Sequence, residues 1–166
     1  MGMLRAQDIL VVLKVIASGK SSFAELGRSL GLSVSQAHSA TKRAIQAGLL
    51  REDGTVRGSA VLEVLTALRY YMPAERGSEV RGVPTAFSAP VLATEEIATD
   101  LRGPVWPHPE GTERGYACSP LYKTAPTAAL QDPALYRLLA LADALRIGNA
   151  RERELAQRLL KEAIGI

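Results

Sequence analysis

The first 72 residues carry apolar side chains at the three-to-four-residue spacing of amphipathic helices. This spacing predicts four helices, over residues 5–18, 23–30, 34–47 and 60–72. A residue suited to capping stands at one end of each helix: Gly19, Ser22, Ser33 and Ser59. Between the third and fourth helices, Asp53-Gly54 predicts a tight hairpin, a short β-wing over residues 49–58.

The remaining residues divide into two parts by composition. Residues 73–131 hold eight of the nine prolines, which interrupt any long central strand, so we expect irregular chain with short strands. Residues 132–166 are again periodic, with Asp132-Pro133 and Asn149 as helix starts, and predict a helical hairpin. The predicted fold is therefore mainly α. It has a helix-turn-helix domain with a wing over residues 1–72 and an accessory region over residues 73–166.

The C-terminal helices carry more leucine than a two-helix hairpin can bury by itself. The stripe consists of Leu135, Leu138, Leu139, Leu145, Leu155 and Leu159. Part of it must pack on the N-terminal helices, and the excess suits a symmetric interface with a second copy. We therefore expect a homodimer held by these helices or by the Pro-rich arm. The alternative is a monomer in which the arm folds over the same stripe.

The motif most informative about function runs from Phe23 to Lys42. Gly27 allows two helices to touch, and Gly31 suits the positive φ of the turn between them. The outer face of the third predicted helix is then polar, as the groove-reading helix of a DNA-binding protein requires. The candidate DNA-binding residues, on this helix and the wing, are Ser33, Ser35, Gln36, His38, Ser39, Lys42, Arg43, Gln46, Arg51 and Arg57.

Charge is distributed unevenly along the chain, whose total is only +3. Residues 1–72 hold nine Lys and Arg against five Asp and Glu, and no acid lies between Glu25 and Glu52. Such a stretch attracts a polyanion. Double-stranded DNA is therefore the expected partner. A solvated basic face in an unrelated helical bundle would give the same charges.

The order of these features resembles the winged helix-turn-helix domains of bacterial transcriptional regulators, including the MarR-like group. The resemblance is carried by Leu-Gly-Leu-Ser-Val-Ser, Ala-Thr-Lys-Arg and Ala-Gly-Leu-Leu within residues 30–50. It implies a cytoplasmic, sequence-specific repressor. The strings at residues 70–77, 81–86 and 104–111 are similar to bacterial winged-helix proteins encoded beside toxin genes of abortive-infection type. This second resemblance implies an alternative, an antitoxin-like module that binds a co-encoded toxin-like protein.

Other kinds of function find little support in the sequence. Cys118 and His108 lie ten positions apart and can meet across a loop, but no third group orients them, so we expect no enzyme. One cysteine and two distant histidines predict no metal site, and no cofactor-binding motif is present. No apolar run is long enough to span a membrane, which predicts a soluble protein. Trp106 either anchors a partner or joins the accessory region to the rest of the fold.

Overall fold

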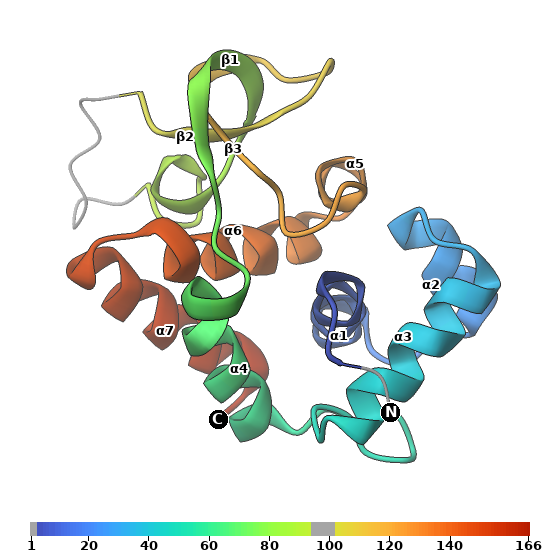
Figure 1. Ribbon diagram of the computed structural model, residues 1–166. Coiled ribbons are helices and arrows are strands. Elements are labelled where there is room, and N and C mark those ends of the chain that lie inside the picture. The colour runs from blue at the N-terminus through green and yellow to red at the C-terminus, as the bar shows by residue number, and fades with distance from the viewer. Residues whose placement is uncertain (1–2, 94–101) are drawn as a thin grey trace.

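A computed structural model describes residues 3–93 and 102–166 (Figure 1). The N-terminal helices are α1 (Ala6–Ser18), α2 (Phe23–Leu30), α3 (Val34–Gln46) and α4 (Gly58–Tyr71). The short helices α5 (Ala125–Leu130) and η1 (Ala86–Ser88, a 3-10 turn) belong to the middle of the chain. Helices α6 (Pro133–Ile147) and α7 (Ala150–Ile164) form the predicted C-terminal hairpin. The mainly α expectation is confirmed at this coarse level.

Local capping explains where most of these helices begin. The side-chain oxygens of Ser22 and Ser33 accept hydrogen bonds from backbone N–H groups three residues on, and those of Asp132 and Asn149 do the same for α6 and α7. The predicted cap Ser59 is wrong. Helix α4 begins at Gly58, two residues before the predicted start at position 60, so Ser59 lies inside its first turn and Arg57 precedes the helix.

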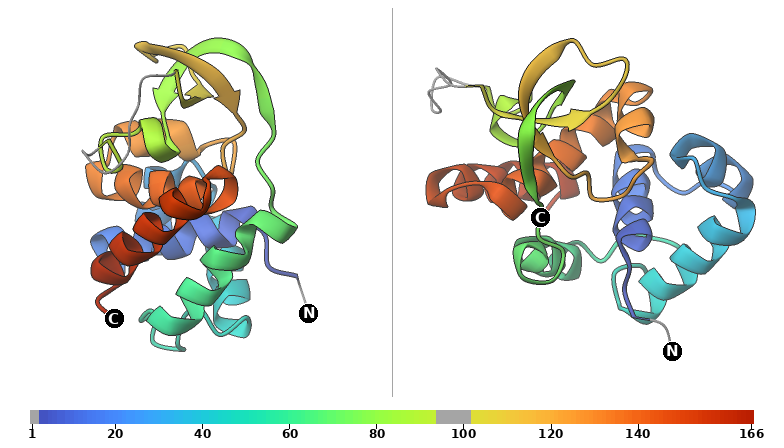
Figure 2. Two further views of the ribbon diagram at one scale, coloured as in Figure 1. Left: turned by 90° about the vertical axis from the view of Figure 1, so that its left-hand side faces the viewer. Right: turned by 45° about the horizontal axis from the view of Figure 1, so that its top comes forward.

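The Pro-rich middle of the chain is more regular than its composition predicts. Strand β1 (Arg76–Pro84) pairs antiparallel with both β2 (Pro104–Pro107) and β3 (Glu113–Cys118), and β2 pairs parallel with β3, so the three strands close on one another. The prolines that belong to strands, Pro84, Pro104 and Pro107, stand at strand ends, where a missing N–H is tolerated. Figures 1 and 2 show this small sheet above α6, on the opposite side of that helix from α4.

A single apolar core joins the helix-turn-helix part to the accessory region. Helix α6 lies at its centre, in contact with α1, α4, α5, α7 and η1. Leu135, Leu138, Leu139 and Leu145 are almost fully buried within one chain, and Leu155 is 8% exposed. The chain therefore buries five leucines of the stripe itself, while Leu159 is only partly buried, and the homodimer stays a prediction. In the described residues, no helix is long and apolar enough to cross a membrane.

Trp106 joins the sheet to this core, one of the two roles considered for it. Its ring is 1% exposed, and its Nε1 donates to Asp143 Oδ2 at 2.8 Å. Thr85 Oγ1 donates to the same oxygen, while Arg146 Nη1 donates to Asp143 Oδ1. Burying a charged carboxylate without partners costs much free energy, and these three hydrogen bonds offset that cost. The sheet is thus fixed to α6 by polar contacts as well as by packing.

Candidate nucleic-acid interface

Helices α2 and α3 form a helix-turn-helix whose corner is determined by two glycines. Gly31 adopts φ 70° in the left-handed region and ends α2. A Cβ on Gly27 would lie only 2.5 Å from the carbonyl oxygen of Leu32, so the close approach of the two helices needs glycine there. Leu26, Leu30 and Leu32 are buried in the corner. The angle between α2 and α3 is therefore set by backbone geometry and packing.

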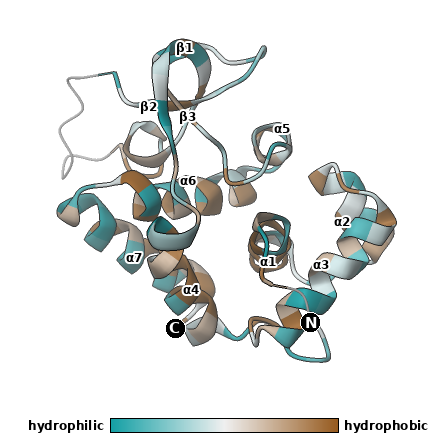
Figure 3. Cartoon of the chain, in the orientation of Figure 1, coloured by the Kyte–Doolittle hydropathy of each residue, from teal (hydrophilic) through white to brown (hydrophobic). Residues whose placement is uncertain are grey.

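Helix α3 presents its small apolar side chains inward and its polar ones outward. Ala37, Ala40 and Ala44 are fully buried against the core. The exposed positions of its outer face are Ser35, Gln36, His38, Lys42 and Gln46, with Ser39 partly exposed. Figure 3 shows α3 largely in the pale and teal colours of intermediate and hydrophilic residues. The predicted outer face of α3 thus forms a continuous polar surface without an acid.

Several of the predicted contact residues already have partners within the chain. Gln36 Oε1 accepts from the Ser33 N–H at 2.9 Å, and Ser33 Oγ accepts from the Gln36 N–H at 3.0 Å. This capping box occupies the Gln36 oxygen that a two-point contact to adenine would need. The His38 ring packs edge-on against Phe23, with 4.9 Å between the ring centroids. Ser33 and Gln36 therefore have a structural role at the start of α3.

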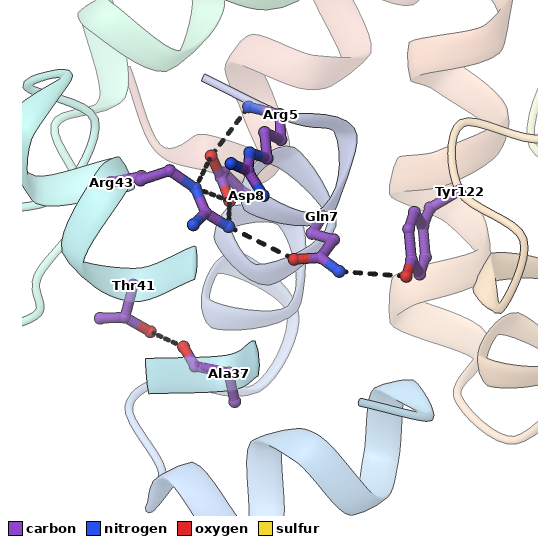
Figure 4. A network of polar contacts seen from close by, with 7 residues as sticks. All are labelled: Arg5, Gln7, Asp8, Ala37, Thr41, Arg43 and Tyr122. Carbon is purple, nitrogen blue, oxygen red and sulfur yellow. Dashed lines mark hydrogen bonds and ion pairs between the residues drawn. The ribbon is translucent and has the colours of Figure 1, made fainter. Parts of the chain in front are cut away.

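Arg43 differs most from its predicted position on the outer face. Its guanidinium contacts Asp8 of α1 through Nε and Nη2, at 2.9–3.1 Å, and its side chain is only 13% exposed (Figure 4). Asp8 is completely buried and also accepts from the Arg5 N–H at 2.8 Å. Arg43 Nη2 further donates to Gln7 Oε1, and Gln7 Nε2 donates to the Tyr122 hydroxyl. This network ties α3 to α1 and to the segment before α5.

The predicted wing is a single turn with one β-bridge, between Leu50 and Val56. Arg51 stabilises this turn by hydrogen bonds within it, since Nη1 donates to Val56 O at 2.8 Å and to Thr55 Oγ1 at 3.3 Å. The Thr55 hydroxyl and N–H both donate to Asp53 Oδ1, and these bonds lower the pKa of the Asp53 carboxyl. The turn therefore has a fixed shape, although paired strands of the usual winged-helix kind are not seen in this segment.

The cations that remain available near α3 come from three segments. Lys42 and Arg57 are exposed, and no ion pair involves either of them within the part of the chain that the structure describes. Lys20, which the sequence analysis did not select, lies beside the wing, because a Cβ on Gly54 would be 3.4 Å from its Cδ. The sequence places Lys20 in the loop before α2, and no sequence pattern relates this loop to the wing.

Cys118 and His108, the pair considered for catalysis, each have other surroundings. Burial raises the pKa of the Cys118 thiol to about 12, so almost no thiolate forms near neutral pH. His108 is engaged elsewhere: its Nε2 lies 3.0 Å from Thr127 Oγ1, and its Nδ1 accepts from the Glu110 N–H. Among the described residues, no group of three or more His, Cys, Asp or Glu side chains is placed to hold a metal ion.

Comparison of the chain with known protein families, with characterised proteins and with solved structures finds no match. A functional assignment of this surface therefore depends on its own geometry and charge.

Proposed function

We propose that this chain is a sequence-specific DNA-binding protein, a transcriptional repressor that reads the major groove with α3. The observation that carries the proposal is the outer face of α3, which is exposed, polar and free of acids on a rigid helix-turn-helix. In this proposal Ser35, Ser39 and Gln46, which are exposed or partly exposed on α3, contact base edges. Lys42 on α3, with Lys20 beside the wing and Arg57 after it, supplies charge for phosphates.

Two copies on one operator would give the specificity that a single short helix lacks. One recognition helix contacts only a few base pairs, and repressors commonly place two of them about one helical turn apart on DNA. Because most of the leucine stripe is buried, we propose that the second copy binds mainly through another surface. Sedimentation of the chain with the selected duplex then shows two chains per duplex.

The decisive variant is Lys42→Ala, because this side chain is exposed and its loss leaves no buried group unpaired. The matched control is Lys161→Ala on α7, an exposed helical lysine outside the helix-turn-helix. Duplexes selected from a random pool provide the probe, and binding is measured by fluorescence anisotropy across a salt series. We expect Lys42→Ala to weaken binding and to reduce the salt slope by about one, the value for one lost phosphate contact. Equal binding by the two variants would contradict the proposal.

A protein-binding role is the second candidate, and one observation favours it. Tyr70 and Tyr71, at the end of α4, are 79% and 46% exposed, and exposed tyrosines are common in protein interfaces. An antitoxin-like module would bind its partner through such a surface. Tyr70→Ser should then abolish capture of the product of a neighbouring gene while leaving DNA binding unchanged.

A further inference from the structure

A second basic surface lies on the outer side of the small sheet. The register of β1 and β3 places Arg81 opposite Arg114, and Glu79 opposite Tyr116. Opposite residues in an antiparallel pair, and residues two apart on one strand, share a face. Arg102 joins this face through an ion pair with Glu79, and the Arg76 guanidinium lies 4.0 Å from the centre of the Tyr116 ring. We call these residues the arginine face: Arg76, Glu79, Arg81, Arg102, Arg114 and Tyr116.

Within the described residues, the positive charge on the arginine face has few acidic partners. Glu79 is the one acid among its six residues, and it contacts both Arg102 and, at 3.8 Å, Arg114. Arg81 forms no ion pair within residues 3–93 and 102–166. Like charges directly opposite on neighbouring strands destabilise a sheet. A bound anion between Arg81 and Arg114 would remove that repulsion.

The strands that carry these arginines are held rigidly. A Cβ on Gly82 would lie 2.0 Å from the carbonyl oxygen of Trp106, and a Cβ on Gly115 would lie 2.1 Å from that of Gly103. The three strands can therefore close only with glycine at both positions. Trp106 in turn is anchored to Asp143 of α6. The guanidinium groups project from a preorganised support, which lowers the entropic cost of binding a ligand.

We infer that the arginine face binds the phosphate groups of a nucleic acid. Guanidinium groups match phosphate oxygens with two parallel hydrogen bonds, and nucleic-acid interfaces are polar and strongly positive. A protein partner would instead call for buried apolar anchors, and Tyr116 is the one aromatic residue on this face. Figures 1 and 2 show the sheet across α6 from α4 and well apart from α3, so this surface would bind a separate segment of nucleic acid.

This inference does not depend on the role of α3, and the test keeps the two apart. Arg81→Glu is made in the Lys42→Ala background, and Lys161→Glu in the same background has the same change of net charge. The probes are a short random-sequence duplex and poly-glutamate, each measured by anisotropy over a salt series. We expect Arg81→Glu to weaken duplex binding and to lower its salt slope by at least about one. Lys161→Glu should change neither. The Tm of Arg81→Glu should equal or exceed that of its parent, because a glutamate would pair with Arg114.

Two results would overturn the inference. Duplex binding by Arg81→Glu that equals that of Lys161→Glu would show that the face does not bind nucleic acid. Poly-glutamate binding as tight as duplex binding, lost in Arg81→Glu, would assign the face to an acidic protein. Either result leaves the proposal for α3 standing if Lys42→Ala alone still weakens binding to selected duplexes.

Discussion

Replacing Arg43 tests whether this residue positions α3 or contacts DNA itself. Arg43→Met removes the hydrogen bonds from the guanidinium to Asp8, whose carboxylate is 0% exposed. Among the described residues, the Arg5 N–H is then the remaining donor to this carboxylate. Breaking a buried ion pair by removing one partner costs about 3–5 kcal/mol, and the surviving donor favours the lower end. For a chain of this length, a loss of about 3 kcal/mol lowers the Tm by roughly 6–12 °C.

The compensating variant is Asp8→Asn with Arg43→Met, which removes both charges but keeps an oxygen to accept from the Arg5 N–H. We expect it to recover much of the lost free energy of unfolding, measured by urea denaturation, with a coupling of about 1–3 kcal/mol between the two sites. If Arg43 acts through Asp8, the folded double variant binds DNA like the parent. A free energy of unfolding for Arg43→Met within about 1 kcal/mol of the parent would refute the reasoning about the buried pair. A stable double variant that no longer binds DNA would show that Arg43 contacts DNA, as the sequence predicted.

Two further predictions concern contacts between the N-terminal helices and the accessory region. Gly31→Val should lower the Tm by about 2–12 °C, since a β-branched residue at positive φ costs about 1–3 kcal/mol and its Cβ would lie 3.2 Å from the Thr124 side chain. Gly48→Val, at φ 80° with no neighbour within 4 Å, isolates the backbone part of this cost, and a parental Tm for Gly31→Val would contradict the turn assignment. Burial opposes ionisation of Asp132, but hydrogen bonds from Lys14 and two backbone N–H groups outweigh it and lower the Asp132 pKa. This contribution is present above the unfolded pKa of about 3.9 and is lost as pH falls through the lower folded pKa. The difference in unfolding free energy between the parent and Lys14→Met should therefore be constant near neutral pH and shrink below about pH 4, whereas a difference independent of pH would exclude the ion pair as its source.

The helices were predictable because their signals are local. A cap such as Ser33 and the groups that it contacts lie within three residues of one another, so the sequence shows both. The closed sheet was not predictable in the same way, because the pairing of Arg76 with Cys118 joins positions separated by most of the Pro-rich segment. Helix α5 is too short to show a periodic stripe, and Pro126 in its first turn resembles the prolines of the preceding strands.

The sequence predicted which residues lie on α3, but not which residues their side chains contact. Helical periodicity places Arg43 on the polar outer side of α3, whereas in the structure its guanidinium binds Asp8 of α1. Its acid, Asp8, stands 35 residues earlier on another helix, and no local pattern relates the two. For the same reason the sequence did not predict that Lys20 lies close to the wing, because this closeness depends on the path of the loop before α2.

Two arginines of this chain therefore differ in the residues that surround their guanidinium groups. Arg43 is 13% exposed and shares its hydrogen bonds between Asp8 and Gln7, so an approaching phosphate would have to displace bonds to a buried carboxylate. Arg81 is exposed on β1 and faces another arginine, so the same phosphate would relieve a repulsion there. The free-energy cost of separating Arg43 from Asp8 opposes phosphate binding by Arg43. The repulsion between Arg81 and Arg114 favours phosphate binding at Arg81. For this reason we expect DNA contacts on α3 to come from Lys42 and its polar neighbours, while Arg43 holds the helix in place.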